Sequence, residues 1–557
     1  MSQIEQYKPD KQEKDGYFYG LAGRPRLVAR TSTSRWTEPQ YIGGWNETPF
    51  KTRKEYLPVI ENEVLSRWNN DLSYAIIEAL GGCSWNYFFP IRIGFEYTGQ
   101  VRPESHIVLL VAVDKDSLQW EDGITIALEC RDILRKFGIS DVEVEIREGR
   151  YEHHAASEHF ETQIDTEGWC SGQTNEAVLP MLSSLGYPIG YLEDLKGQGT
   201  VGLHLKLSRD ETSATFYGLT CRHVVSRGRH IHESYKFSGE QRQYHVQANH
   251  TGFSDCSQEL ERIQLGLEKS MEPLLAAKDK WEQWYMYDET KKNRCPTEED
   301  EKHLLELQVE VAYNAKIIEN LAKIKEKNER EIGHLAYHSN LQISSLRPGY
   351  LKDWALIELN PDKFVNGPEN KVFIGSRPEL THISKRILEN GFLSLVLGDE
   401  VEALGRHGIV GKRGSRTGLT FGTKSGIEAV IRHPSADGED VYAWEMLIVP
   451  EPKYEKFSDR GDSGAAIFDS RGRVIGLVTG STDARPEDDW RGVCEYGTSN
   501  SRKKRYPGGY TYPEDADNTA KDDLAKLPNG VDITFAAPIQ WVLEDIQDFT
   551  GLQARLA

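Results

Sequence analysis

The spacing of apolar residues predicts a compact α/β unit over residues 25–150. Residues 55–80 carry apolar side chains at helical intervals, and the unbroken apolar run at 107–113 is typical of a buried strand. A second amphipathic helix is predicted over 120–137, and the alternation at 142–146 predicts a half-exposed strand. Because strand, helix and strand at this spacing resemble one βαβ unit, we expect an α/β domain of unassigned role, with regulation or docking as the simplest interpretation.

The pattern changes at about residue 175 to short strands punctuated by glycine, which predict an all-β barrel or sandwich. Examples of these strands are GYPIGYL (186–192), GTVGLHLKL (199–207) and TFYGLT (215–220). Two stretches of helical periodicity interrupt the pattern at 254–330, and they predict an inserted antiparallel helical hairpin. Residues 482–530 are rich in Asp, Gly, Pro and Lys, so we expect a long surface loop there.

The predicted organisation therefore has four parts. They are a mobile polar segment at 1–24, the α/β domain at 25–150, a linker at 151–174 and the β domain at 175–557. The pair His153-His154 falls in the linker. We interpret it as a solvated loop pair, because no third metal ligand accompanies it.

Composition narrows the function further. With 38% hydrophobic and 28% charged residues among 557, the chain is typical of a soluble globular protein, and its longest aliphatic run is far shorter than the ~20 residues of a membrane-spanning helix. Lys and Arg number 67 against 87 Asp and Glu, and this net charge of −20 argues against nucleic acid or membrane partners.

Cysteine usage and the N-terminus bear on location. The polar N-terminus lacks the apolar core of a secretory signal, and the seven scattered cysteines form no CxxC pair. We therefore expect reduced thiols and a cytoplasmic protein. The basic stretch at 501–505 leaves nuclear import open, although a solvated charge run is the simpler interpretation.

Three short stretches of the β region carry candidate chemistry. His223 follows a strand in LTCRHVV, Asp353 heads a buried strand in KDWALIEL, and Ser463 lies in DRGDSGAAIF. A serine hydroxyl is a poor nucleophile near neutral pH, so it needs a base, a carboxylate that orients the base, and donors for the oxyanion. Each motif alone is weak evidence for this chemistry, because a GDSG string arises by chance in one of about fifty chains of this length.

The order and surroundings of the motifs resemble the chymotrypsin/trypsin-like serine peptidases over roughly 175–550. Thr220-Cys221-Arg222-His223 is similar to the family's Thr-Ala-Ala-His, Asp353-Trp354-Ala355-Leu356 to its Asp-Ile-Ala-Leu, and Gly461-Asp462-Ser463-Gly464 matches its nucleophile loop. The glycine-rich stretch 405–426 is similar to a hairpin of the second barrel, and Pro538–Phe549 to the closing helix. The sequence Arg416-Thr417-Gly418-Leu419-Thr420 and the expected location resemble an intracellular, fungal branch of the family more than its digestive enzymes. The resemblance implies an all-β double barrel, trypsin-like, carrying the helical hairpin as an insertion.

The resemblance also implies the roles of individual residues. Ser463 would be the nucleophile, His223 the general base and later acid, and Asp353 the residue that holds the imidazole tautomer. The backbone N–H groups of Gly461 and Ser463 would form the oxyanion hole. No metal or organic cofactor is implied.

The specificity pocket departs from that of trypsin. Phe457, six residues before the nucleophile, stands where the family keeps the floor of its pocket, with Thr479 and Gly480 on the wall. Without a carboxylate at the floor, we expect a shallow or apolar pocket rather than cleavage after Arg or Lys.

Activation is a second departure. In secreted members a new N-terminal amine pairs with the aspartate before the serine, here Asp462, but no plausible cleavage signal precedes the barrel. Asp462 therefore needs another cation, or the oxyanion loop forms only on binding.

The functional prediction is a serine endopeptidase that hydrolyses polypeptide substrates through an acyl-enzyme. The alternative is a catalytically inert trypsin-like scaffold that acts as an intracellular interaction or regulatory protein. In either case, a protein partner could bind the helical hairpin or the N-terminal domain.

Overall fold

A computed structural model describes most of the chain. The described residues are 4–21, 25–38, 41–42, 50–51, 54–59, 68–95, 106–153, 185–191, 199–208, 215–226, 233–239, 244–248, 262, 264–266, 268–280, 302–305, 307–308, 311, 330–364, 367–374, 388–389, 392–398, 408–433, 440–451, 456–482 and 533–557. The predicted surface loop at 482–530, apart from Thr482 itself, and the basic stretch at 501–505 lie outside them.

The N-terminal part is built on a sheet with two helices. Its elements are β1 (Leu27–Arg30), β4 (Lys54–Leu57), α2 (Ser73–Ala79), β5 (Trp85–Phe95), β6 (His106–Val113), α3 (Trp120–Lys136) and β7 (Glu143–Glu148). Strands β6 and β7 are parallel and α3 connects them, so the strand–helix–strand pattern predicted from the sequence is present. The independence of 25–150 as a domain stays a prediction.

Two sequence predictions in this part are wrong. Among the residues of 55–80 that the structure describes, the expected α-helix is present only as α2, because Tyr56 and its neighbours pair with β5 as strand β4 instead. The segment expected to be mobile begins with a 3-10 turn, η1 (Glu5–Tyr7), and the helix α1 (Lys11–Gly16). Phe18 and Leu21, which follow α1, are buried in an apolar cluster with residues of β5 and β6, and this burial fixes the segment.

Six strands of the C-terminal half close into a barrel. They are β21 (Gly408–Gly414), β22 (Gly418–Lys424), β24 (Val441–Pro450), β27 (Thr534–Pro538), β26 (Arg473–Thr482) and β25 (Ala466–Asp469). Each strand pairs with the next in this order, and β25 pairs back with β21. The interior is filled by alternate side chains such as Ile448, Ile467 and Val478.

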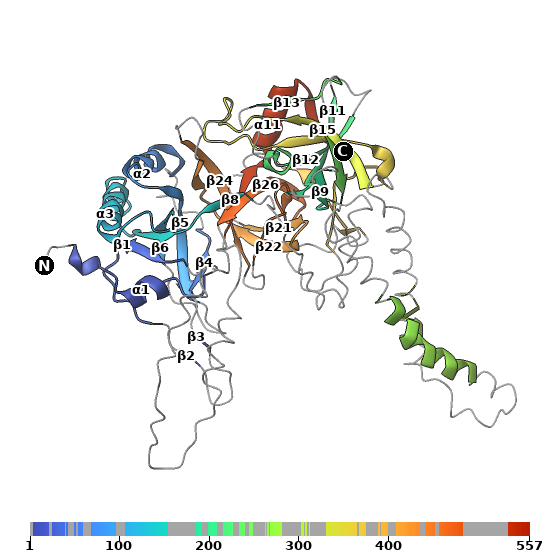
Figure 1. Cartoon of the computed structure of the whole chain (residues 1–557), viewed down its shortest axis with the longest axis horizontal. Coiled ribbons are helices and arrows are strands. Elements are labelled where there is room, and N and C mark those ends of the chain that lie inside the picture. The colour runs from blue at the N-terminus through green and yellow to red at the C-terminus, as the bar shows by residue number, and fades with distance from the viewer. Residues whose placement is uncertain are drawn as a thin grey trace, which may run out of the picture.

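A second set of strands forms a half-barrel. In spatial order they are β10 (Gly199–Thr200), β9 (Pro188–Tyr191), β14 (His245–Ala248), β15 (Glu331–His338), β16 (Ala355–Leu359), β12 (Thr215–Thr220), β11 (Leu203–Ser208) and β28 (Gln553–Leu556), while β13 (Tyr235–Lys236) pairs with β15. The structure is thus mostly β, with one closed and one half-closed barrel, which is consistent with a double-barrel fold (Figure 1).

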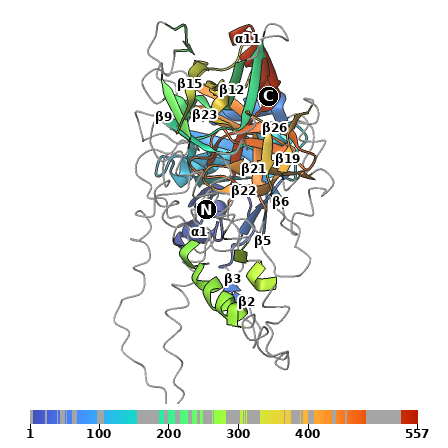
Figure 2. The same ribbon diagram turned by 90° about the vertical axis from the view of Figure 1, so that its right-hand side faces the viewer.

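The helix α11 (Ile539–Thr550) follows β27 and lies against the half-barrel (Figure 2). Asp545 on its inner face accepts a hydrogen bond of 2.6 Å from the indole of Trp354, and Lys352 lies 3.3 Å from the same carboxylate. These contacts fix the segment that enters β16. The remaining short elements are β2 (Tyr41–Ile42), β3 (Phe50–Lys51), η3 (Trp68–Leu72), β8 (Tyr151–His153), α6 (Arg222–Val225), η8 (Pro361–Lys363), β17 (Lys371–Phe373), β18 (Leu388–Glu389), β19 (Phe392–Ser394), β20 (Val396–Leu397) and β23 (Ala429–His433).

One sheet runs from the N-terminal part into the closed barrel. Strand β5 pairs with β23, which pairs with β24, so β1, β7, β6 and β5 share a sheet with the barrel strands. Residues 151–153, expected in a linker, instead form β8, and Figure 1 shows this strand between the N-terminal sheet and β26. The linker prediction is wrong at these three residues.

The predicted helical hairpin is described only in pieces. Residues 268–280 and 302–305 are helical, and the green helical segment projects away from the barrel strands in both views (Figures 1 and 2). Leu304 and Leu307 are buried, whereas most of 268–280 is exposed. The pairing of the two helices into a hairpin stays a prediction. Within the described residues, no helix is long and apolar enough to cross a membrane.

Candidate active site

His223 and Asp353 meet because their strands are neighbours. Strand β12 pairs with β16 in a register that places Thr220 opposite Ala355. His223 follows the end of β12 in the short helix α6, and Asp353 lies two residues before β16. The carboxylate accepts hydrogen bonds from the His223 backbone N–H (3.0 Å, Oδ1) and from Nδ1 (2.5 Å, Oδ2).

Ser463 completes this arrangement from the other barrel. Its Oγ lies 2.7 Å from Nε2 of His223, and its carbonyl accepts a bond of 2.8 Å from the backbone N–H of Thr200 in the half-barrel. A carboxylate only accepts hydrogen bonds, so the His223 proton resides on Nδ1, and the lone pair of Nε2 faces the serine hydroxyl. Three residues separated by 130 and 110 positions thus form one hydrogen-bonded line.

The three side chains are shielded from water. Ser463 has no exposed surface, Asp353 is buried, and the His223 side chain is 11% exposed. Low local polarity strengthens the hydrogen bonds of the line and the attraction between Asp353 and a protonated imidazole.

The turn around Ser463 contains two glycines with positive φ. Gly461 has φ +110° and Gly464 has φ +89°, conformations that other residues rarely adopt. The Gly461 carbonyl accepts bonds from the hydroxyls of Ser415 (2.6 Å) and Thr200 (2.8 Å). Within the described residues, the backbone N–H groups of Gly461 and Ser463 donate to no other group.

A buried ion pair holds this turn from inside. The Nζ of Lys412, on β21, lies 3.1 Å from Oδ2 of Asp462, and neither side chain has exposed surface. Burial lowers the pKa of Lys412, and the carboxylate of Asp462 acts in the opposite direction. Asp462 also accepts from the backbone N–H groups of Arg416 (2.7 Å) and Asp459 (3.0 Å). Lys412 therefore supplies the cation that the sequence analysis expected opposite Asp462. Sequence reasoning did not identify Lys412 itself.

A second buried carboxyl group lies behind the serine. Glu445 of β24 accepts a hydrogen bond from the Thr479 hydroxyl, and the Thr479 carbonyl lies 3.4 Å from the Ser463 Oγ. Burial raises the pKa of Glu445 to about 8, so the group is largely protonated at neutral pH. Sequence reasoning missed this residue as well, since an isolated Glu in the strand VYAWEMLIVP carries no motif.

The predicted pocket residues are only partly brought together. Thr479 and Gly480 lie on β26 next to the serine. The Phe457 side chain is instead fully buried among Val410, Met446, Ile448 and other core residues. The assignment of Phe457 to a pocket floor stays a prediction.

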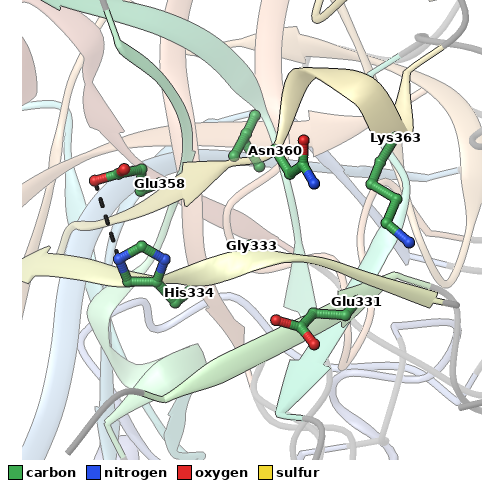
Figure 3. A pocket seen from close by; sticks show the side chains of 7 residues that line it. Glu331, Gly333, His334, Glu358, Asn360 and Lys363 are labelled. Carbon is green, nitrogen blue, oxygen red and sulfur yellow. Dashed lines mark ion pairs between the residues drawn. The ribbon is translucent and has the colours of Figure 1, made fainter. Parts of the chain in front are cut away.

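The hollow drawn in Figure 3, with a volume of about 360 Å³, lies elsewhere on the half-barrel. It is lined by β15, β16 and η8, and Nε2 of its His334 lies 4.0 Å from a carboxylate oxygen of Glu358. Its lining contains none of the three aligned side chains. We therefore assign no part of the serine chemistry to it.

A metal ion does not fit the aligned residues. Cys221, His223 and Asp353 offer three ligand atoms within 4.8 Å of one another. The Cys221 thiol, however, donates to the carbonyl of Val478 at 3.1 Å, and burial raises its pKa well above the usual value. A metal ligand must be a thiolate, and Nδ1 of His223 is already bonded to Asp353. The cluster is better explained by the serine–histidine–aspartate line.

Comparisons with known proteins add little to this geometry. No family model matches the sequence, and no curated protein matches it. A solved structure described as a glutamic acid specific serine protease that uses a novel histidine triad in substrate binding is similar with a TM-score of 0.26 and 11% identity, covering 67% of this chain and all of the other. At that TM-score the likeness carries no argument, and the functional assignment depends on the site itself.

We predict that Glu445 makes the stability of the fold depend on pH. The folded carboxyl group keeps its proton up to a pKa of about 8, whereas the unfolded group loses it near the ordinary glutamate pKa of 4.5. Between these values the folded state binds more protons, so stability falls as the pH rises through this window. Melting temperatures at pH 5.5 and 8 should differ less in Glu445→Gln than in the wild type.

The control is Glu121→Gln, since the Glu121 side chain is 67% exposed. It should retain the pH dependence of the wild type. An unchanged dependence in Glu445→Gln would show that Glu445 ionises equally in both states.

Proposed function

We propose that this protein is a serine endopeptidase of trypsin-like double-barrel architecture, with Ser463 as nucleophile. The observation that carries the proposal is the line from Asp353 through His223 to Ser463, with bonds of 2.5 and 2.7 Å. Beside it lie the backbone N–H groups of Gly461 and Ser463, which donate to no group in the part of the chain that the structure describes. An inert scaffold has no physical need for the line and the oxyanion turn together.

In the proposed reaction, the Ser463 Oγ attacks the carbonyl carbon of a peptide bond while Nε2 of His223 takes its proton. Asp353 stabilises the imidazolium that forms, and the N–H groups of Gly461 and Ser463 stabilise the oxyanion. His223 then protonates the leaving amine, which departs and leaves an ester on Ser463. A water molecule, deprotonated by His223, hydrolyses this ester and restores the free serine.

The remaining sequence expectations extend the proposal. Polypeptides are the substrate class, the cytoplasm is the expected location, and an apolar pocket is expected in place of one for Arg or Lys. The described helical pieces at 268–280 and 302–305 are consistent with an insertion that recruits a protein partner.

We predict that a fluorophosphonate probe labels the folded protein at Ser463. Ser463→Ala should abolish labelling, and His223→Ala should reduce its rate by several orders of magnitude, because the hydroxyl loses its base. Gel fluorescence and intact mass measure the adduct. The control Ser117→Ala removes an exposed hydroxyl from the turn after β6 and should label as the wild type does. Labelling that persists in Ser463→Ala, or fails in the folded wild type, would favour the inert scaffold.

We also predict that Lys412 is a positioning residue for the oxyanion turn. Lys412→Met leaves the Asp462 carboxylate buried without its cation, so the turn should rearrange. We expect kcat/KM for peptide hydrolysis to fall about tenfold or more, a barrier increase of at least ~1.4 kcal/mol. The fall should lie mainly in kcat, because the oxyanion forms only during the reaction.

The matched control is Lys424→Met. Lys424 is a buried lysine on β22 that donates to the backbone carbonyl of Ser425. It should lose stability without a comparable fall in kcat. Equal kinetic losses in the two variants would assign Lys412 a purely structural role.

A further inference from the structure

One edge of β26 forms hydrogen bonds both with the turn that carries Ser463 and with β8. In its first half, β26 pairs with β25, which follows the nucleophile, with Ala466 opposite Leu477. The pairing continues into the turn, where the Gly464 N–H donates to the carbonyl of Val478 at 2.9 Å. Strand β27 pairs along the opposite edge of β26. On the edge nearer the serine, the residues beyond Thr479 therefore pair with β8.

Strand β8 runs towards the serine. It is antiparallel to β26, with Tyr151 opposite Thr482, Glu152 opposite Ser481 and His153 opposite Gly480. The next position along β26 is Thr479, whose carbonyl lies 3.4 Å from the Ser463 Oγ. In a chain that pairs with β26 in this register, each successive residue lies closer to Ser463. The residues on the acyl side of a scissile peptide bond must approach the nucleophile in the same way.

The close approach is possible because residue 480 is glycine. A Cβ at this position would lie 2.6 Å from the Glu152 carbonyl oxygen. An extended peptide that adds to a sheet edge gains main-chain hydrogen bonds whatever its sequence, and side-chain contacts then provide selectivity.

Arg460 provides such a contact. It immediately precedes Gly461, and its Nε donates to Oε2 of Glu152 at 2.8 Å while a terminal nitrogen bonds the same oxygen. The Arg460 and Glu152 side chains are 30% and 27% exposed, so the pair is partly shielded from solvent. The guanidinium of Arg460 favours an acidic side chain on any strand that pairs with this edge. The favoured position is the one opposite Ser481, two residues before the position opposite Thr479.

We propose that the edge Gly480–Thr482 binds extended peptides with an acidic residue opposite Ser481, and that Tyr151–His153 is its internal competitor. The proposal depends on the proposed peptidase function, because it assigns that function a substrate class and an autoinhibitory strand. Tyr151 anchors the competitor, with ring centroids 5.1 Å from His433 and 5.7 Å from Phe535.

The tether makes the competitor effective. Only Gly149 and Arg150 separate β8 from β7, and both are held by the N-terminal sheet. The Gly149 carbonyl accepts a bond of 2.9 Å from the Asn86 side chain, and Arg150 pairs with Asp114 at 2.9 Å. An intramolecular strand acts at a high effective concentration, so a free peptide must compete against it.

The test is a charge exchange across the pair. Glu152→Arg and Arg460→Glu each place like charges together and should release β8, whereas the double variant restores an ion pair of opposite polarity. We expect kcat/KM for a quenched-fluorescence peptide library to rise severalfold in each single variant and to return towards the wild-type value in the double variant. Peptides with Glu at the acidic position should be preferred over Lys in Glu152→Arg, and this preference should invert in Arg460→Glu.

The control is Glu544→Arg on α11, which breaks another Arg–Glu pair, the partly exposed one between Glu544 and Arg347. It should leave kcat/KM unchanged. If all variants are labelled by fluorophosphonate but the charge exchanges leave kcat/KM at the wild-type value, β8 is a permanent strand and the proposal is overturned.

A binding measurement separates this proposal from the peptidase function. A fluorescent peptide with the sequence of residues 149–154 should bind Glu152→Arg at least tenfold more tightly than the wild type, read by anisotropy. Absence of labelling and hydrolysis together with this binding would refute the peptidase and retain the peptide-binding edge. Equal weak binding to both proteins would overturn the edge, and melting temperatures close to that of the wild type establish that each variant is folded.

Discussion

The buried ion pair between Lys412 and Asp462 is the constraint on which the rest of the site depends. Asp462 lies between Gly461 and Ser463, so the position of its carboxylate sets the orientation of both neighbouring backbone N–H groups. Removing one partner of a buried pair leaves an uncompensated charge, which is strongly unfavourable. The turn therefore cannot rotate away from the barrel without breaking the 3.1 Å contact with Lys412. The positive charge that faces Asp462 thus comes from within the barrel itself.

Strand β26 connects the chemistry to the rest of the molecule. One of its edges pairs with the strand after Ser463 and with β8, and the other pairs with β27. Because β8 follows directly on β7, the N-terminal sheet and the serine are linked through three consecutive residues. Any displacement of the N-terminal sheet relative to the barrel would thus change the occupancy of the edge beside the nucleophile.

The parts of the site that the sequence predicted are those whose chemistry is tied to a local motif. His223, Asp353 and Ser463 each follow or precede a recognisable strand, and the order of the three motifs was informative. Lys412 has no such signal, because its role depends on a contact between strand β21 and Asp462, fifty residues later in the chain. Tyr56 was predicted helical from its spacing, and pairing with β5 overrode that local preference. Strand β8 escaped prediction because the strand conformation of its three residues depends on pairing with the distant edge of β26, which the local sequence does not reveal.

Three groups near Asp353, those of Glu445, Cys221 and Tyr151, are largely uncharged at neutral pH. Burial raises the pKa of Glu445 to about 8 and moves the pKa values of Cys221 and Tyr151 well above their usual ranges. At neutral pH, Asp353 therefore acts on the imidazole without a competing thiolate, phenolate or second carboxylate from these three groups. Above pH 8 the Glu445 carboxyl ionises, and its negative charge adds to that of Asp353. Ionisation of Glu445 therefore places a second negative charge near the buried Asp353 carboxylate, and this repulsion opposes the folded state at alkaline pH.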